Sequence, residues 1–103
     1  MDKEVLKGKV ISTLKLVYDP EIPVDVYNLG LIYKIIPDEE GNIDLTMTLT
    51  APNCPVADNI VQEIYEKIKQ IEEVNSVNIN LVFDPPWNPS MASEIAQLQL
   101  GML

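Results

Sequence analysis

Cys54, the only cysteine of the chain, is the residue with the clearest capacity for chemistry. It stands directly before Pro55, and proline is favoured at the first position of a helix, where its missing N–H group would be unpaired in any case. A sulfur at a helix N-terminus feels the helix dipole and unpaired amide protons, both of which favour the thiolate. One interpretation of Cys54 is therefore a reactive thiol. The alternative is a buried structural cysteine, which is the commoner fate of this residue type.

Carboxylates gather on the segments that we expect near this thiol: Asp19, Glu21, Asp25 and Asp84. They would disfavour the thiolate, and a metal cation would resolve the conflict because thiolate and carboxylates both attract it. We therefore predict a divalent-metal contact at Cys54. Its further ligands would be Glu21, Asp25 and Asp84. General acid–base catalysis by paired carboxylates is a weaker interpretation, because Asp19 precedes a proline and serves equally as a helix terminator, while Glu21 and Asp25 also fit solvated positions.

Trp87, the only tryptophan, lies in a proline-rich segment that cannot continue a strand, because proline has no amide hydrogen to donate. Its ring either plugs the end of the core or forms a rigid aromatic wall for a pocket or a partner. Gly30 ends the Asn28-Leu29-Gly30 run and is expected to supply a backbone bend or a close approach beside the following strand. The run is a poor candidate for a phosphate site, because the fuller glycine pattern of such loops is missing.

The composition limits the kind of protein and its partners. The 103 residues suffice for one domain with an apolar core, and 47% hydrophobic with 22% charged residues is typical of a folded soluble chain. A net charge of −9 and the absence of arginine argue against nucleic acid and anionic membranes as partners. Without histidine there is no Ser-His or Cys-His pair and no usual zinc site, which excludes most classes of hydrolase and metalloenzyme. One cysteine also excludes an internal disulfide and a cluster held by four cysteines of one chain.

Apolar periodicity predicts six elements that must position these residues. Asp2 is a helix cap, apolar residues recur at helical spacing from Leu6 to Val17, and Asp19-Pro20 ends this helix. The further elements are a strand at 31–36, a strand at 43–49, a helix from Pro55 to Ile71, a strand at 77–83 and a short helix from Ser93 towards Gly101. The charged start Met1-Asp2-Lys3-Glu4 and the lack of a long apolar stretch predict a cytoplasmic chain with neither a signal peptide nor a membrane span.

Alternation along the strands assigns their side chains to two faces. In the second strand, the predicted core face carries Ile43, Leu45, Met47 and Leu49. The predicted polar face carries Asp44, Thr46, Thr48 and Thr50. In the third strand, the predicted apolar face carries Val77, Ile79, Leu81 and Phe83.

The order α-β-β-α-β-α predicts an α/β (α+β) fold, a single small domain over residues 1–103 with a three-stranded mixed sheet and helices on one face. A short turn joins the first two strands, which should be antiparallel, and a helix joins the second and third, which should be parallel through a right-handed crossover. The loops 19–30, 51–55 and 84–87 should then converge at one edge of the sheet.

Three stretches of the sequence carry a family resemblance: Asp19-Pro20-Glu21-Ile22-Pro23-Val24-Asp25-Val26-Tyr27-Asn28-Leu29-Gly30-Leu31-Ile32-Tyr33, Thr50-Ala51-Pro52-Asn53-Cys54-Pro55 and Asp84-Pro85-Pro86-Trp87. In this order and spacing the chain resembles the metal-sulfur cluster biosynthetic proteins, a family with SufT-like and PaaD-like members that is related to the eukaryotic cytosolic iron-sulfur assembly targeting factor. The resemblance implies a single iron-sulfur cluster assembly type domain with Cys54 as its functional thiol. The expected loop pocket consists of Asp19, Glu21, Asp25, Asn28, Gly30, Thr50, Pro52, Asp84, Pro86 and Trp87.

The resemblance implies a non-catalytic accessory or targeting factor that helps to mature iron-sulfur client proteins, with Cys54 making a transient contact with a metal, a cluster or a partner. We expect no tightly bound cofactor, only transient iron or an iron-sulfur cluster, and as partners iron-sulfur assembly proteins and client apoproteins. One chain offers one thiolate, so a cluster would need ligands from a second subunit of a homodimer, a small thiol or a client. The alternative is a purely protein-binding adaptor, for example in PaaD-like maturation of an oxygenase component, with Cys54 structural. A thiol enzyme that works without histidine is a weaker third interpretation.

Overall fold

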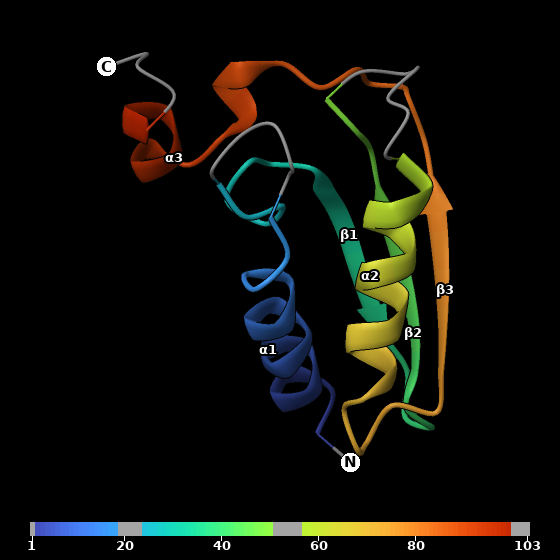
Figure 1. Cartoon of the computed structure of the whole chain (residues 1–103). Helices are drawn as coiled ribbons and strands as arrows, with labels where there is room; N and C mark the ends of the chain where they lie inside the picture. The colour runs from blue at the N-terminus through green and yellow to red at the C-terminus, as the bar shows by residue number, and fades with distance from the viewer. Residues whose placement is uncertain (1, 19–23, 51–56, 100–103) are drawn as a thin grey trace.

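The computed structural model describes residues 2–18, 24–50 and 57–99, and its elements follow the predicted order (Figure 1). A short 3-10 turn that the sequence did not predict precedes the last helix. The elements are α1 (Lys3–Leu14), β1 (Ile32–Pro37), β2 (Asn42–Met47), α2 (Ala57–Lys69), β3 (Ser76–Leu81), the 3-10 turn Pro89–Met91 and α3 (Glu94–Gln99).

Helix α1 begins as predicted and ends earlier than predicted. The Asp2 carboxylate accepts a hydrogen bond from the Glu4 backbone amide at 2.9 Å and so caps the helix. The helix ends at Leu14 and does not continue to Asp19. The backbone of residues 17 and 18 is used elsewhere, because the Val17 carbonyl accepts from the Val26 amide at 2.8 Å and Tyr18 forms an isolated bridge with Asp25. These pairings hold the described part of the 19–30 loop against the end of α1.

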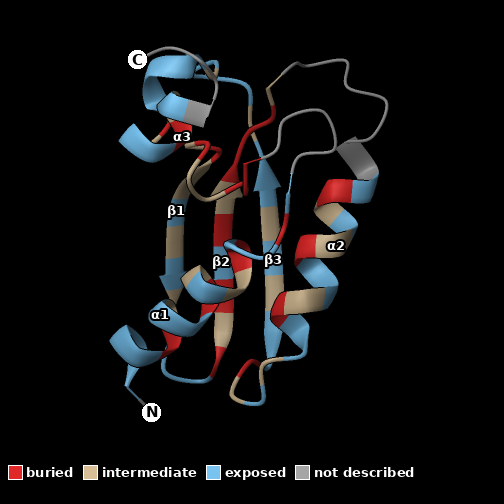
Figure 2. Ribbon diagram, turned by 60° about the vertical axis from the view of Figure 1, so that its left-hand side comes forward, coloured by how far each residue is buried: buried red, intermediate tan, exposed pale blue. Residues whose placement is uncertain are grey.

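The three strands form one mixed sheet in the order β1-β2-β3, as predicted. Strands β1 and β2 are antiparallel with Ile35 opposite Leu45, and β2 and β3 are parallel with Leu45 opposite Ile79. Strand β2 lies in the middle, and Figure 2 shows that the buried residues of the sheet concentrate on it. Since β2 has a neighbour on both sides, β1 and β3 are the two edges of the sheet.

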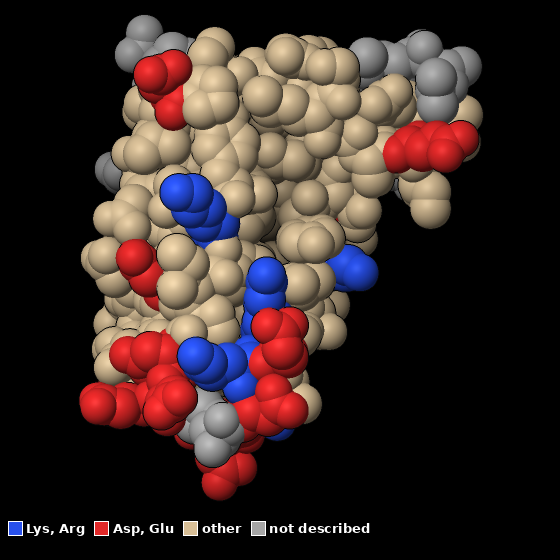
Figure 3. All heavy atoms as spheres, turned by 180° about the vertical axis from the view of Figure 1, so that it is seen from behind, with Lys and Arg blue, Asp and Glu red and all other residues tan. Residues whose placement is uncertain are grey.

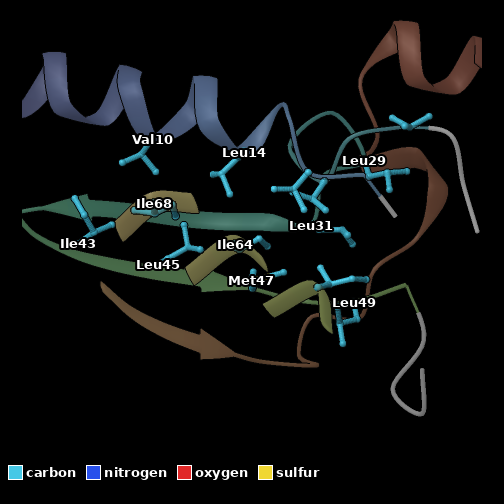
Figure 4. Packing of buried hydrophobic residues seen from close by; sticks show 14 of the residues in the cluster. Val10, Leu14, Leu29, Leu31, Ile43, Leu45, Met47, Leu49, Ile64 and Ile68 are labelled. Atoms are coloured by element: carbon cyan, nitrogen blue, oxygen red, sulfur yellow. The ribbon is translucent and has the colours of Figure 1, made fainter. Parts of the chain in front are cut away.

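Helices α1 and α2 cover one face of the sheet, and α3 lies beyond its upper end (Figures 1 and 2). The core between helices and sheet is apolar, and Figure 4 shows side chains from both helices pointing towards β2. Its largest fully buried members include Leu6, Leu14, Leu29, Leu31, Ile43, Leu45, Met47, Ile64 and Ile68. No helix within the described ranges has the length and apolarity needed to cross a membrane.

Strand β3 keeps its predicted faces, because Leu81 is opposite the buried Met47 just as Ile79 is opposite Leu45. Leu81 and Phe83 are nevertheless 39% and 41% exposed, because β3 is an edge strand and ends at Leu81. One prediction about the strand faces is wrong: Thr48 is fully buried although the alternation placed it on the polar face. It lies just beyond the end of β2, where its amide donates to the Leu31 carbonyl at 2.8 Å and where the segment after β3 borders the same pocket.

Candidate functional site

The loop before β1 and the segment after β3 meet at the upper end of the molecule as seen in Figure 1. The Trp87 indole N–H donates to the Leu29 carbonyl at 2.6 Å, and the Tyr33 hydroxyl donates to the Pro85 carbonyl at 2.8 Å. Further along, the Ser93 amide donates to the Asn28 carbonyl at 2.7 Å. These contacts join parts of the chain that are more than fifty residues apart in sequence. The predicted convergence of these two segments is confirmed for their described residues.

The described end of the second predicted loop reaches the same place. Thr50 lines a small pocket of about 130 Å³ together with Pro86 and Trp87. Thr48, Leu49 and Phe83 complete its wall. Among the described residues, the buried Thr48 hydroxyl has no hydrogen-bond partner. We call this end, formed by residues 24–30, 48–50 and 83–93, the loop end.

Several predicted site residues lie outside the described residues. They are Asp19, Glu21, Pro52 and Cys54. Cys54 belongs to a six-residue segment, 51–56, whose two neighbours in the chain are Thr50 of the loop end and Ala57, the first residue of α2. The roles that the sequence assigned to these four residues stay predictions.

Asp25 organises the loop before β1. It is only 8% exposed, and its two carboxylate oxygens accept hydrogen bonds from Asn28, at 2.9 Å from the backbone amide and at 2.8 Å from the side-chain amide. The Leu29 amide in turn donates to the Asp25 carbonyl at 3.0 Å. Asp84, in the segment after β3, is exposed. Within the described ranges no group of three or more Asp, Glu, Cys or His side chains is placed to hold a metal ion.

Gly30 makes the close backbone approach that the sequence predicted. Its φ angle is +82°, in the left-handed region that favours glycine, and a Cβ atom there would collide with the backbone carbonyl of Met91. The Met91 sulfur also lies 3.8 Å from the Tyr33 hydroxyl. Glycine therefore lets the turn before β1 pack directly against the 3-10 turn after β3.

Trp87 combines both interpretations that the sequence allowed. Its ring is partly buried against the core and also lines the pocket beside Thr50. Sequence reasoning missed the roles of Tyr33 and Thr48. The signal for Tyr33 was a side chain with a polar tip at the start of an otherwise apolar strand, because a half-buried tyrosine hydroxyl usually finds a partner.

Charge is unevenly distributed over the surface. Figure 3 shows the molecule from behind, with lysine, aspartate and glutamate side chains gathered towards the lower part and few charges on the upper part. On the face shown the upper part carries few charges, and Phe83 and Met91 of the loop end are exposed apolar side chains. A neutral, partly apolar surface is suited to contact with another protein.

Comparison with known proteins places this geometry in a family. The family model described as iron-sulfur cluster assembly protein matches residues 7–81. The chain is 48% identical over 105 residues to the Fe-S protein maturation auxiliary factor of Porphyromonas gingivalis, covering 100% of both chains. It is 39% identical over 100 residues to the Fe-S protein maturation auxiliary factor YitW of Bacillus subtilis, covering 97% of this chain and 98% of that one.

A solved structure agrees with this result. The crystal structure of a domain of unknown function from Bacillus anthracis superposes with a TM-score of 0.91 at 37% sequence identity, covering 98% of this chain and 96% of that one. The matched region 7–81 contains β1, β2, α2, β3 and the last two thirds of α1. The sequence similarity and the structural similarity therefore agree, and the chain belongs to the iron-sulfur cluster assembly protein family.

Proposed function

We propose that this chain is an auxiliary factor in the maturation of iron-sulfur proteins, and that Cys54 makes a transient contact with iron, with a cluster or with a partner. The observation that carries the proposal is the loop end. It gathers Trp87, Gly30 and Thr50, which come from the three stretches of the family resemblance. Cys54 follows Thr50 by four residues in the sequence, and the strong similarity to maturation auxiliary factors supports the same role.

The chemistry of the cargo fits a transient contact. One chain supplies one thiolate, and the oxygens of Glu21, Asp25 and Asp84 would complete a mixed ligand set with open positions. Asp25 already accepts two hydrogen bonds from Asn28, one at each carboxylate oxygen, and each oxygen keeps a further lone pair with which it could bind a metal. Such a set holds iron weakly and suits its passage to another protein better than its storage. A cluster would need further thiolates from a second copy, a small thiol or a client.

The partners in this proposal are assembly proteins that deliver iron or clusters and apoproteins that receive them. The loop end would make the contact through exposed apolar side chains such as Phe83 and Met91, whose burial desolvates no charge. The compartment would be the cytoplasm, where a lone cysteine stays reduced.

A transfer assay tests the proposal. An apo-ferredoxin is mixed anaerobically with iron(III), sulfide and a dithiol, and formation of the cluster is followed by visible absorption with and without the protein. We expect the wild type to accelerate maturation and Cys54→Ala to lose most of this effect. Ser12→Ala, on the exposed side of α1, is the matched control and should behave as the wild type. Equal acceleration by wild type and Cys54→Ala would favour the adaptor role with a structural Cys54.

Direct metal contact is tested separately. Cobalt(II) is titrated anaerobically into the wild type, Cys54→Ser and Asp84→Asn, and the sulfur-to-metal charge-transfer band is recorded. We expect a band in the wild type that strengthens as pH rises, because protons must leave the ligands, and that is lost in Cys54→Ser. The absence of a band with excess metal would contradict metal ligation by the isolated chain.

The reactivity of the thiol is a further test. Iodoacetamide should modify Cys54 in the native protein, and protection of Cys54 until global unfolding would contradict a functional thiol.

A further inference from the structure

A groove of about 340 Å³ follows the open edge of β1. Five consecutive residues of the strand, 32–36, line it, and Lys7 and Ile11 of α1 form the opposite wall with Tyr27. Strand β1 has a bulge between Ile32 and Lys34, and residues from both faces of the strand border the groove, so the groove runs along the strand's edge. Lys7 and Ile11 are four residues apart and therefore share one face of the helix.

The edge of β1 is open for pairing. In the described sheet β1 has one neighbour, β2, so the backbone N–H and C=O groups that point away from β2 face the groove. The side chains along it are mainly apolar, and Ile36 is 54% exposed. An open edge beside an apolar wall is the geometry in which an extended peptide adds to a sheet.

The charge of the groove is opposite to that of the molecule. Lys7 and Lys34 both line it, on a chain with net charge −9 and only seven lysines. A third lysine, Lys15, lies nearby with its Nζ 5.5 Å from the centre of the Tyr27 ring. Across residues 2–18, 24–50 and 57–99 the ion pair found is Lys9–Glu73, so neither groove lysine is neutralised by a described carboxylate.

From this edge, this apolar wall and Lys34 we propose that the groove binds an extended segment of a partner protein, rich in alternating acidic and apolar residues, which adds as a strand beside β1. Five strand residues span about 16 Å, so the segment would be about five to seven residues long. Its backbone would pair with β1. Its carboxylates would contact Lys34 on the face of the sheet that carries Thr46, and its apolar side chains would lie on the face that carries Ile35 and α1. This proposal stands independently of any role for Cys54.

A second copy of the chain is a poorer occupant. Pairing two β1 edges would bring the two copies of Lys34 close to each other, and edge lysines are a common protection against such self-pairing. The two copies would also each carry a charge of −9. An acidic partner segment meets no such repulsion at the groove.

Titration with a designed peptide tests the proposal. The probe is acetyl-Glu-Val-Glu-Val-Glu-Val-Glu-amide, added to nitrogen-15-labelled protein, and amide shifts are followed by NMR. We expect saturable shifts that concentrate at residues 32–36 and at Lys7 and Ile11. The same peptide with lysine in place of glutamate should bind about three- to tenfold more weakly, because the attraction to Lys34 becomes a repulsion. A peptide N-methylated at alternate amides should also lose binding, since it cannot pair with β1.

Variants of the protein test the charges. Lys34→Glu should weaken binding of the acidic peptide by roughly three- to tenfold. Lys67→Glu on α2 changes the net charge equally but lies outside the groove, and should stay within about twofold of the wild type. The two modified peptides are tested on the wild type, so the result does not depend on the folding of a variant.

Several results would overturn the proposal. They are the absence of saturable shifts at residues 32–36, equal binding of the acidic and basic peptides, and equal binding of the N-methylated peptide. Shifts of the same amides with protein concentration alone would assign the edge to self-association. Equal shifts on addition of phosphatidylglycerol vesicles would assign the lysines to anionic lipid.

Discussion

Gly30 joins the turn before β1 to the 3-10 turn after β3 through a contact of backbone with backbone. With φ at +82° and the Met91 carbonyl where a Cβ would lie, both conformation and space require glycine. We predict that Gly30→Ala lowers the free energy of unfolding by about 1–3 kcal/mol, through strain at this position and displacement of Met91. The change is measured by urea denaturation.

Gly8 provides the matched control for Gly30. It lies inside α1, and nothing stands within 4 Å of the place where its Cβ would be. Gly8→Ala should therefore raise stability by about 0.5–1 kcal/mol, because alanine loses less backbone entropy in a helix. If both substitutions changed stability in the same direction, the steric explanation for Gly30 would be wrong.

The sequence could predict some single residues of the site and not others. Gly30 and Trp87 were found because their residue types have narrow uses, a left-handed backbone for one and a large ring with one donor for the other. Thr48 could not be found, because alternation gives the side of a strand but not what covers it. Pro86 and Trp87 lie beside Thr48 in the same pocket, and they come from a proline-rich segment without a hydrophobic periodicity from which its position could be predicted.

At the scale of elements, β2 and α2 form the centre of the core. Leu45 and Ile64 are fully buried, whereas Thr46 is partly exposed on the opposite face of β2. We predict that Leu45→Ala and Ile64→Ala each lower the free energy of unfolding by about 2–5 kcal/mol, because each removes buried atoms and leaves a cavity. Thr46→Ala should cost less than about 1 kcal/mol. Equal losses at all three sites, measured by chemical denaturation, would contradict the observed register.

The hairpin turn between β1 and β2 depends on the ionised form of Asp38. Its carboxylate accepts from the Asn42 side chain at 3.0 Å and from the backbone amides of Asn42 and Glu40 at 2.9 and 2.8 Å. The hydrogen bond from the Asn42 side chain is the main cause that lowers the pKa of Asp38, and that from the Asn42 backbone amide is the next. A lowered pKa in the folded state means that the ionised turn favours folding.

The pH dependence of the stability that this turn contributes follows from the lowered pKa of Asp38. The stabilisation by Asp38 is present above the ordinary carboxyl pKa of about 4 and is lost as pH falls through the lower folded pKa. We predict that Asp38→Asn destabilises the protein at pH 7 and that the difference from wild type shrinks below about pH 4. This difference is measured by the midpoints of urea denaturation of the wild type and the variant across pH. Glu39→Gln in the same turn is the control, and a difference for Asp38→Asn that stays constant with pH would contradict the prediction.

Element types followed from periodicity more reliably than element ends. The helical spacing of Leu6, Val10 and Leu14 predicted α1 correctly, and all three side chains are buried. Its end at Leu14 was not predictable, because the backbone of Val17 pairs with Val26, a contact between separate segments. For the same reason the exposure of Phe83 could not be foreseen, since a sequence pattern does not reveal which strand has one neighbour.

At the scale of the whole molecule, topology was predictable because connection lengths restrict it. A short turn between β1 and β2 leaves only antiparallel pairing, and a helical crossover between β2 and β3 gives a parallel pair. The same rule placed the described loop segments at one end. The groove along β1 was not foreseen, because it depends on how far α1 lies from the edge of the sheet.

The two pairings of β2 also differ in how much chain must be ordered before they form. Strands β1 and β2 are joined by four residues, whereas facing residues of β2 and β3 are 34 positions apart. Closing the longer loop costs roughly 1–2 kcal/mol more in chain entropy. We predict that the hairpin is largely formed in the folding transition state and that β3 docks afterwards, so Ile35→Ala should give a higher φ-value than Ile79→Ala.

Stopped-flow kinetics can follow this order through the fluorescence of Trp87, the only tryptophan. An Ile79 φ-value equal to or above that of Ile35 would show that β3 is part of the nucleus. Because Asp84–Trp87 follows β3 directly, the contacts of Trp87 with Leu29 and of Pro85 with Tyr33 wait for β3 to dock. The loop end is therefore completed in the last step of folding, and a chain that has paired only its hairpin has no assembled site.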